Sequence, residues 1–254
     1  MMYDDMVNKK IVKQLTQKKV RNELGLFLVE GRKSVDELLA SDFEIAHIFC
    51  TREYLHTRPA TNSDLYTVLT QSELESLGTL EENDSVLAVV KKRVVSESAY
   101  ESAFQGGAPA LYLDAIRDPG NLGTIIRSAD WFGIQTLFVS PDTVDCYNAK
   151  VIAATMGSFT RVSVIERTHA EVVAMAERYG FEIAALVLSG KSIYEAPLKN
   201  NTLFIMGSES HGVSGALLTH ATCTLTIPSW GTAESLNVSI ATAITLSEYR
   251  RRFP

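Results

Sequence analysis

Several features common in nucleotide-binding and secreted proteins are missing from this sequence of 254 residues. Its fifteen glycines include no pair separated by one residue, which excludes the Gly-rich fingerprint of dinucleotide-binding proteins. The Gly-Lys-Ser triplet at 190–192 is no P-loop, because Ala185 stands where the first glycine of that loop is required. The three cysteines are scattered, and no cluster has metal-ligand spacing. We therefore expect no disulfide framework and no metal site.

Long hydrophobic runs are also absent. No segment approaches the roughly 20 apolar residues that a membrane-spanning helix needs, and the first ten residues contain no apolar stretch typical of a secretory signal. The sequence predicts a cytoplasmic protein with reduced cysteines.

A net positive charge is found near the amino terminus, whereas the rest of the chain is net negative. The chain carries a net charge of −6, but residues 7–33 hold eight basic residues against two acidic ones. This segment therefore has a net charge of +6 and the rest of the chain −12. A short basic segment can supply phosphate contacts to a nucleic acid.

The first 95 residues alternate short strands and helices. We expect a basic amphipathic helix at 8–22, a helix at 34–41 capped by Ser34, a loop at 51–64 and a helix at 71–78. Strands are predicted at 27–31, 45–50, 65–70 and 85–92. This pattern indicates a compact α/β domain over 1–95, followed by a linker at 96–108 that ends in a Gly-Gly pair.

Residues 109–254 have a more regular rhythm. Strands are expected at 110–116, 136–140, 159–166, 181–190 and 223–230, with another that begins at 201 and runs into a turn by 212. Helices are expected at 121–133, 145–158, 169–180 and 236–253. Apolar strands without polar alternation, separated by helices, are typical of a parallel sheet covered on both faces.

Three segments of this half carry unusual polar residues. In the first, Asn121 follows an Asp-Pro-Gly turn as a predicted N-cap, and Arg127 interrupts an otherwise apolar helix. Such an arginine either faces solvent beside Asp130 or aims its guanidinium at an anion. In the second, Glu209 lies in a Gly/Ser turn at the carboxyl end of a strand, where open α/β sheets bind ligands. Glu209 could equally cap a helix.

The third segment, 225–244, leads from a strand through a Pro turn into a long helix. Ser235 is the predicted N-cap of that helix. This leaves Asn237 unexplained, since asparagine disfavours a helix interior.

Together the three segments resemble the motifs of the SpoU/TrmH family of RNA ribose methyltransferases. Asn121 and Arg127 match its Asn-x5-Arg motif, and Gly207, Glu209 and Gly212 match its Gly-x-Glu-x-x-Gly motif. The Ile-Pro…Ser-Leu-Asn-Val-Ser motif is matched by Ile227, Pro228, Ser235, Leu236, Asn237, Val238 and Ser239. Residues 18–39 are similar to the substrate-binding domain of many family members.

The resemblance implies an α/β fold whose C-terminal parallel-sheet domain (109–254) contains a deep trefoil knot, preceded by a smaller ribosomal-protein-like α/β domain (1–95). It implies a homodimer that binds S-adenosylmethionine in the knot. The cofactor-binding residues it suggests are Leu186, Leu188, Gly190, Met206, Gly207, Gly212, Ile227 and Leu236.

The implied reaction is transfer of a methyl group to a ribose 2′-hydroxyl. The implied catalytic residues are Arg127, Asn121, Glu209, Ser235 and Asn237, with Glu209 orienting Arg127 or a loop backbone. The family proposal makes Arg127 a general base. Because arginine stays protonated, the alternative is that it clamps a phosphate and stabilises the nascent alkoxide. No metal is needed.

The implied substrate is RNA, with ribosomal RNA favoured over transfer RNA by the separate N-terminal domain. A non-catalytic RNA-binding protein of the same fold is a further alternative. Phosphate contacts are predicted from the basic residues Lys9, Lys10, Lys13, Lys18, Lys19, Arg21 and Arg32.

Overall fold

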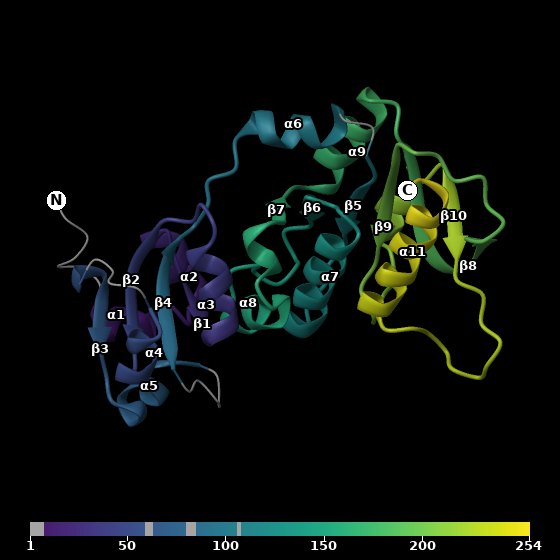
Figure 1. Cartoon of the computed structure of the whole chain (residues 1–254). Helices are drawn as coiled ribbons and strands as arrows, with labels where there is room; N and C mark the ends of the chain where they lie inside the picture. The colour runs from purple at the N-terminus through teal and green to yellow at the C-terminus, as the bar shows by residue number, and fades with distance from the viewer. Residues whose placement is uncertain (1–7, 59–62, 80–84, 106–107) are drawn as a thin grey trace. The chain divides into compact units, whose positions relative to one another are not determined.

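The computed structural model describes residues 8–58, 63–79, 85–105 and 108–254. The chain forms two compact units (Figure 1). The first comprises residues 1–94 together with 145–160, and the second comprises 95–144 together with 161–254. A segment from the second half of the sequence is therefore part of the first unit.

The first unit is built on a four-stranded sheet with the order β1-β4-β2-β3. Strand β4 (Val86–Lys91) pairs antiparallel with both β1 (Leu26–Glu30) and β2 (Ile45–Cys50), and β3 (Tyr66–Val68) runs parallel to β2. Its helices are α1 (Lys9–Gln14), α2 (Lys18–Leu24), α3 (Arg32–Leu39), α4 (Arg52–His56), α5 (Gln71–Leu77) and α8 (Ala149–Thr155), with short 3-10 turns η2 (Ser63–Leu65) and η3 (Ser158–Thr160).

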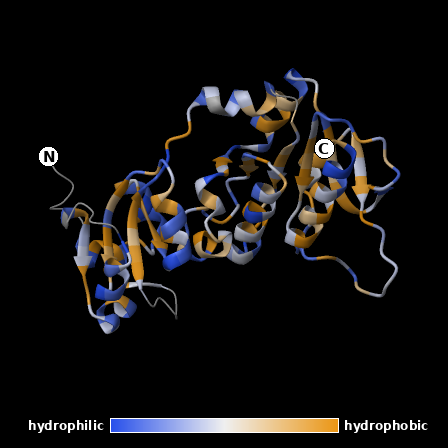
Figure 2. Cartoon of the chain, in the orientation of Figure 1, coloured by the Kyte–Doolittle hydropathy of each residue, from blue (hydrophilic) through white to orange (hydrophobic). Residues whose placement is uncertain are grey.

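Apolar side chains on the two faces of this sheet form two core clusters. Because successive residues of a strand point to opposite faces, Leu26 and Leu28 pack with α1 and α5, while Phe27 and Val29 pack with α3. Ile152 and Phe159 of the 145–160 segment belong to the second cluster. Figure 2 shows the strands as the most hydrophobic parts of this unit.

The second unit contains a six-stranded sheet, β10-β8-β9-β5-β6-β7, in which every pairing is parallel. Its strands are β5 (Ala110–Leu113), β6 (Thr136–Val139), β7 (Ser163–Glu166), β8 (Glu182–Ser192), β9 (Thr202–Met206) and β10 (Cys223–Thr226). Its helices are α6 (Glu97–Gln105), α7 (Pro119–Trp131), α9 (His169–Arg178), α10 (Gly215–Leu218) and α11 (Val238–Arg252).

Helices cover both faces of the parallel sheet. Leu203 and Ile205 of β9 point into a cluster that includes residues of α6 and α9. Phe204, between them in sequence, points the other way and meets the ring of Tyr249 in α11, edge to face at 5.8 Å. The α/β class and the parallel, doubly covered sheet expected from the sequence are therefore confirmed.

Several local predictions were wrong. The expected helix 8–22 is broken into α1 and α2, and the expected loop 51–64 contains α4, whose N-terminus is capped by Thr51. Ser34 lies inside α3 and does not cap it. The expected linker 96–108 contains α6, whose Tyr100 and Phe104 are buried against the sheet; Gly106 and Gly107 lie outside the described residues.

Candidate active site

Polar residues from all three motif segments meet on the second unit. The Asn237 side-chain amide donates to Asn121 Oδ1 at 2.9 Å. The Asn121 amide in turn donates a short hydrogen bond to Glu209 Oε1. These residues are 88 and 116 positions apart in the sequence. One continuous hydrogen-bonded chain therefore joins the three motifs.

Asn237 reaches this position because it caps α11. Its backbone, with φ −55° and ψ 138°, is not helical, and its Oδ1 accepts from the Ser239 N–H at 2.8 Å and from the Ser239 hydroxyl at 2.6 Å. The predicted cap at Ser235 was wrong. The position of Asn237 resolves the apparent conflict with helix propensity, since a cap residue lies outside the helix interior.

Asn121 is the third residue of α7 and lies in the first turn of this helix. The N-cap is Asp118, whose Oδ1 accepts from the Asn121 N–H at 2.8 Å, and Pro119 occupies the first helical position. The expected cap at Asn121 was therefore wrong, and the Asn121 side chain is free to bind Glu209 and Asn237.

Glu209 is presented by a tight turn after β9. Ser208 and Gly212 form an isolated bridge, and the Gly212 N–H donates to the Ser208 carbonyl at 2.9 Å. Gly212 has a φ of +67°, and a Cβ on Gly207 would lie only 2.0 Å from the Gly212 carbonyl carbon. Both glycines therefore allow the two ends of the turn to pack closely together. In this compact turn, Glu209 points toward Asn121.

Arg127 and Ser235 are not joined to this hydrogen-bonded chain. Arg127 follows Asn121 by six residues, which places it about 9 Å along the helix axis and roughly 120° around it. Arg127 is exposed and has no hydrogen bond or ion pair with another described residue. Glu209 binds Asn121, so the expectation that Glu209 orients Arg127 is replaced by this contact.

The residues expected to hold the cofactor lie at the carboxyl edge of the sheet. Strand β8 runs between β9 and β10, so the segment Leu186–Gly190 lies between the ends of these two strands. Thr226 Oγ1 donates to the Leu188 carbonyl at 3.1 Å, just before Ile227. Met206 is the last residue of β9, and Gly207 follows it.

This edge suits a ligand with both apolar and polar groups. Leu188 and Leu236 are 74% and 48% exposed, which is unusual for leucine, while the backbone of β8 is fixed beside them. Gly190 permits this arrangement because a Cβ there would lie 2.7 Å from the Leu225 carbonyl carbon. An adenosine and an aliphatic sulfonium chain would find apolar cover and backbone polar groups here, so the residues present fit S-adenosylmethionine.

Residues 108–247 match the SpoU rRNA Methylase family, and residues 8–88 match the MRM3-like substrate binding domain. The chain belongs to the SpoU rRNA methylase family.

Full-length relatives support this assignment. The chain is 31% identical to the 23S rRNA (guanosine(2553)-2′-O)-methyltransferase RlmP of Bacillus subtilis, over 94% of each chain. A TrmH-family protein from Porphyromonas gingivalis has 33% identity and a TM-score of 0.82, with 96% of this chain and 97% of that chain covered. An AdoMet-bound rRNA methyltransferase from Sinorhizobium meliloti has 27% identity and a TM-score of 0.83, covering 97% and 95%.

A buried acid that belongs to none of the family motifs, Asp114, lies at the same edge of the sheet. Asp114 directly follows β5 and is 4% exposed. Its carboxylate accepts from the Ser214 N–H at 2.8 Å and lies 3.0 Å from His169 Nε2. Asp114 thus ties the loop after β9 to the end of β5. The only sequence signal for it was a carboxylate at the end of an apolar strand, and we did not identify it.

A groove of about 370 Å³ opens between α7 and α11. Ile240, 52% exposed, lines it together with small and hydroxyl side chains. Glu248 lies at one end and is 5% exposed; hydrogen bonds first from Arg251 and then from Arg252 hold the pKa of its carboxyl at about 2. The groove therefore combines apolar surface from Ile240, Ala243 and Ile244 with an acid that is paired with arginines.

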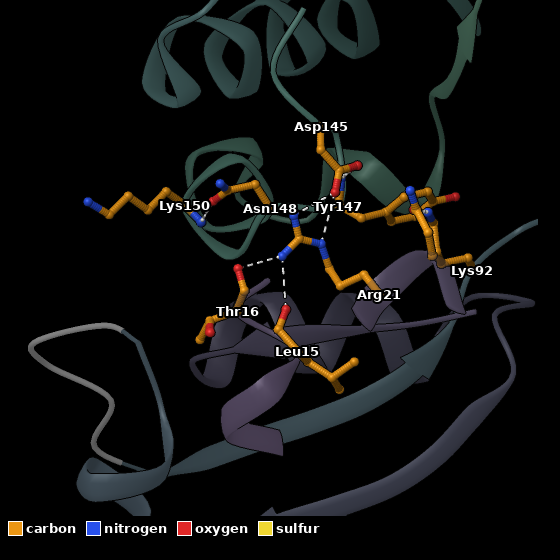
Figure 3. Close-up of polar contacts among 9 residues, drawn as sticks. Leu15, Thr16, Arg21, Lys92, Asp145, Tyr147, Asn148 and Lys150 are labelled. Atoms are coloured by element: carbon orange, nitrogen blue, oxygen red, sulfur yellow. Dashed lines mark hydrogen bonds and ion pairs between the residues drawn. The ribbon is translucent and has the colours of Figure 1, made fainter. Parts of the chain in front are cut away.

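The predicted RNA-binding residues fall into different environments. Arg21 is buried, and its guanidinium binds Asp145 and two backbone carbonyls, so we withdraw it from the phosphate-binding set (Figure 3). Lys9 and Lys19 form ion pairs with Glu73 and Glu23. The other four, Lys10, Lys13, Lys18 and Arg32, are exposed and form no ion pair with a described residue.

In the described parts of the chain, no helix has the length and apolar composition needed to cross a bilayer.

Proposed function

We propose that this protein transfers a methyl group from S-adenosylmethionine to a ribose 2′-hydroxyl of ribosomal RNA. The observation that carries the proposal is the hydrogen-bonded chain Asn237–Asn121–Glu209, which brings the three family motifs to one place. Membership of the SpoU family and the ribosomal RNA specificity named for RlmP support the choice of substrate. Transfer RNA is the alternative substrate that the experiments below distinguish.

The cofactor supplies an electrophilic methyl group, so the protein must supply position and charge. A ribose hydroxyl is weakly acidic, and groups that stabilise developing negative charge on its oxygen lower the barrier. Arg127 is a suitable group because it is exposed, remains protonated and has no internal partner among described residues. We assign it to the nascent alkoxide and the neighbouring phosphate.

Asn121 and Asn237 position the ribose. A hydrogen bond joins their side-chain amides, so both side chains are already ordered before the substrate binds. Glu209 fixes Asn121 from the opposite side. Ser235 lies two residues before the Asn237 cap, and we propose that its exposed hydroxyl contacts the same sugar.

The cofactor is proposed to lie at the edge formed by the ends of β8, β9 and β10. Gly207 and Met206 would contribute backbone contacts from β9, and Ile227 and Leu236 would cover it from the loop before α11. The contacts from β8 would come from Leu186, Leu188 and Gly190, with Gly212 closing the turn. The C-terminal trefoil knot stays a prediction.

The domain boundaries also stay a proposal, with an RNA substrate-binding domain at 1–95 and the methyltransferase domain at 109–254; the connection at 96–108 includes α6. The match of residues 8–88 to a substrate binding domain supports the first of these. We propose that the protein acts in the cytoplasm, where ribosomal RNA is its substrate.

We further propose that the protein is a homodimer. The groove between α7 and α11 supports this, because Ile240, Ala243 and Ile244 of α11 present apolar surface beside α7. Exposed apolar patches of this kind mark association surfaces. Sedimentation of the purified chain should give a mass near twice 27.9 kDa.

The decisive variants are Arg127→Ala and Arg117→Ala. Both arginines are exposed and without an ion pair among described residues, but only Arg127 belongs to the motif. We expect Arg127→Ala to lower the methyl transfer rate about 10²- to 10³-fold, as loss of an electrostatic stabiliser does. Arg117→Ala should retain most activity.

Calorimetric titration with S-adenosylmethionine is the companion measurement. Both variants should bind the cofactor like the wild-type protein, since neither residue lies at the proposed cofactor edge. Retained turnover in Arg127→Ala would refute its assignment. A loss of cofactor binding would mean that Arg127 acts on the cofactor and not on the RNA.

A further inference from the structure

The segment 145–160 is held firmly in the first unit. Tyr147 packs on Phe27 with ring centroids 4.6 Å apart, and Phe159 meets the same ring edge-on at 6.1 Å. A Cβ on Gly157 would lie 2.5 Å from Glu37 Cγ, and Gly157 has a φ of +98°. A larger residue would be strained there and would overlap the Glu37 side chain, so glycine allows the segment to pack closely against α3.

A buried ion pair fixes the start of the segment. Arg21 Nη2 lies 2.6 Å from Asp145 Oδ2, and the two side chains are 4% and 10% exposed. The same guanidinium donates to the carbonyls of Leu15 and Thr16, both at 2.9 Å. All directions of the guanidinium are thus engaged in joining α1, α2 and the segment (Figure 3).

Two lysines flank this pair. Figure 3 shows Lys92 on one side of Arg21 and Lys150 on the other. Lys92 Nζ lies 4.8 Å from the centroid of the Tyr147 ring and donates to Asn22 Oδ1 at 2.7 Å. Asn22 and Lys18 are four residues apart in α2, so they share one face of that helix. Lys150 is in the first turn of α8.

Lys18, Lys92 and Lys150, here called the α2–α8 patch, differ from the four lysines of the chain that form ion pairs. None of the three has a carboxylate within ion-pair distance among described residues. Lys9, Lys19, Lys91 and Lys199 each have one. Asp145, which Figure 3 shows between Lys92 and Lys150, is already paired with Arg21. Lys150 also lies where a helix favours acidic residues, so nothing within the described chain balances its charge.

We propose that the α2–α8 patch binds RNA phosphates, and that it is a composite surface. Lys18 lies within residues 8–88, which match the substrate binding domain, and Lys92 follows that match, whereas Lys150 lies in the sequence that matches the SpoU family. Lysines without a carboxylate partner are suited to replace the counterions of a phosphate backbone. The Arg21–Asp145 pair fixes the 145–160 segment, and with it Lys150, relative to α2. The pair itself does not contact the RNA.

This inference rests on the proposed function, because it names how the same RNA is held. It corrects the sequence-based assignment in two ways. Arg21 becomes a positioning residue, and Lys92 and Lys150, which lie outside the basic segment 7–33, become phosphate contacts. Neither lysine stood out in the sequence because each is separated from that segment by many residues.

The test compares two double variants of the full chain. Lys92→Ala/Lys150→Ala removes two patch lysines, and Lys91→Ala/Lys199→Ala removes the same charge from two lysines that are paired with Glu44 and Glu182. RNA affinity is measured by filter binding from 0.05 to 0.5 M salt, with unmodified ribosomal RNA transcript as the probe. Circular dichroism verifies that both variants are folded.

We expect the patch variant to lose about 1.4 to 1.8 from the slope of log affinity against log salt, since each phosphate contact contributes about 0.7 to 0.9. At 0.1 M salt this corresponds to binding that is weaker by on the order of tenfold. The control variant should keep the wild-type slope.

Equal slopes for the two variants would overturn the patch assignment while leaving the proposed function intact, provided that the wild-type protein methylates the RNA. If the wild-type protein transfers no methyl group to any RNA, the proposed function itself fails. A Lys150→Glu variant gives a further check, because reversing the charge should weaken binding more than removing it.

Discussion

Two arginines of this protein, Arg21 and Arg127, illustrate how environment decides what a residue does. In the sequence, Arg127 interrupts an otherwise apolar helix, whereas Arg21 is one of several basic residues near the amino terminus. Arg21 is 3% exposed and is bonded to Asp145, Leu15 and Thr16 in the first unit. Arg127 is exposed in the second unit without an internal partner among described residues. A buried arginine with all three guanidinium nitrogens engaged stabilises the fold, whereas an exposed one beside an ordered polar site is available to a substrate.

Substitutions in the Arg21–Asp145 pair should lower the stability of the first unit. Asp145→Asn leaves a buried guanidinium without a counter-charge, which costs about 3–5 kcal/mol. Hydrogen exchange of β1 and β4 should accelerate, and exchange of β9 in the second unit should stay unchanged. Adding Arg21→Met should restore part of the protection. If Asp145→Asn alone leaves exchange of β1 unaffected, the pair is not a structural anchor.

The active-site region has its own structural anchor at Gly207. In Gly207→Ala the new methyl group would overlap the Gly212 backbone, at 2.0 Å, so the turn must move and stability should fall by about 1–3 kcal/mol. Gly215→Ala is the matched control, since a Cβ there meets nothing within 4 Å. Urea unfolding of both variants measures the difference. Equal midpoints would show that the turn accommodates a side chain.

A subtler variant separates the two roles of Asn237. Asn237→Asp keeps an oxygen that caps α11 but removes the amide that donates to Asn121. We expect a nearly unchanged melting temperature with a methyl transfer rate lower by about tenfold, equivalent to one lost hydrogen bond of about 1.4 kcal/mol. Wild-type turnover in Asn237→Asp would reduce Asn237 to a cap.

The smallest effect is expected at Glu248, another acid bound by arginines. Its pKa is about 2 because Arg251 and Arg252 donate to it, and Arg251 is 67% exposed. A lowered pKa stabilises the fold above the unfolded pKa of about 4.5 and loses that contribution as the pH falls toward 2. Glu248→Gln should therefore be less stable than wild type at pH 7, by only about 0.5–1 kcal/mol because Arg251 is solvent-screened.

The pH dependence provides the check. Thermal unfolding of wild type and Glu248→Gln should converge as the pH falls from about 4.5 to about 2. A difference in stability that does not change with pH would exclude the carboxylate as its cause.

Much of the second unit could be predicted from its sequence. Apolar strands without alternation give a parallel sheet, and Gly180, with a φ of +68°, follows α9 as expected of a residue after a helix end. The motif residues Asn121, Glu209 and Asn237 were identified before their contacts were known. Helix caps were less predictable, because Asp118 and Asn237 compete with neighbours that have equal capping propensity.

What local pattern could not reveal was long-range pairing. The sequence of the basic segment gives no indication that Arg21 meets Asp145, 124 residues later. For the same reason the 145–160 segment, which reads as part of the second half, was not expected in the first unit. A contact between distant segments depends on the tertiary fold, so burial of a charged residue is visible only in the structure.

The most direct test of the central claim is the chemical position of the transferred methyl group. Unmodified ribosomal RNA is incubated with the protein and S-adenosylmethionine labelled in the methyl group, and the RNA is then hydrolysed with alkali. A 2′-O-methyl ribose blocks cleavage of the adjacent phosphodiester, so the account predicts that the label appears in one alkali-resistant dinucleotide. Label in a mononucleotide with a methylated base, or no incorporation into RNA, would contradict it.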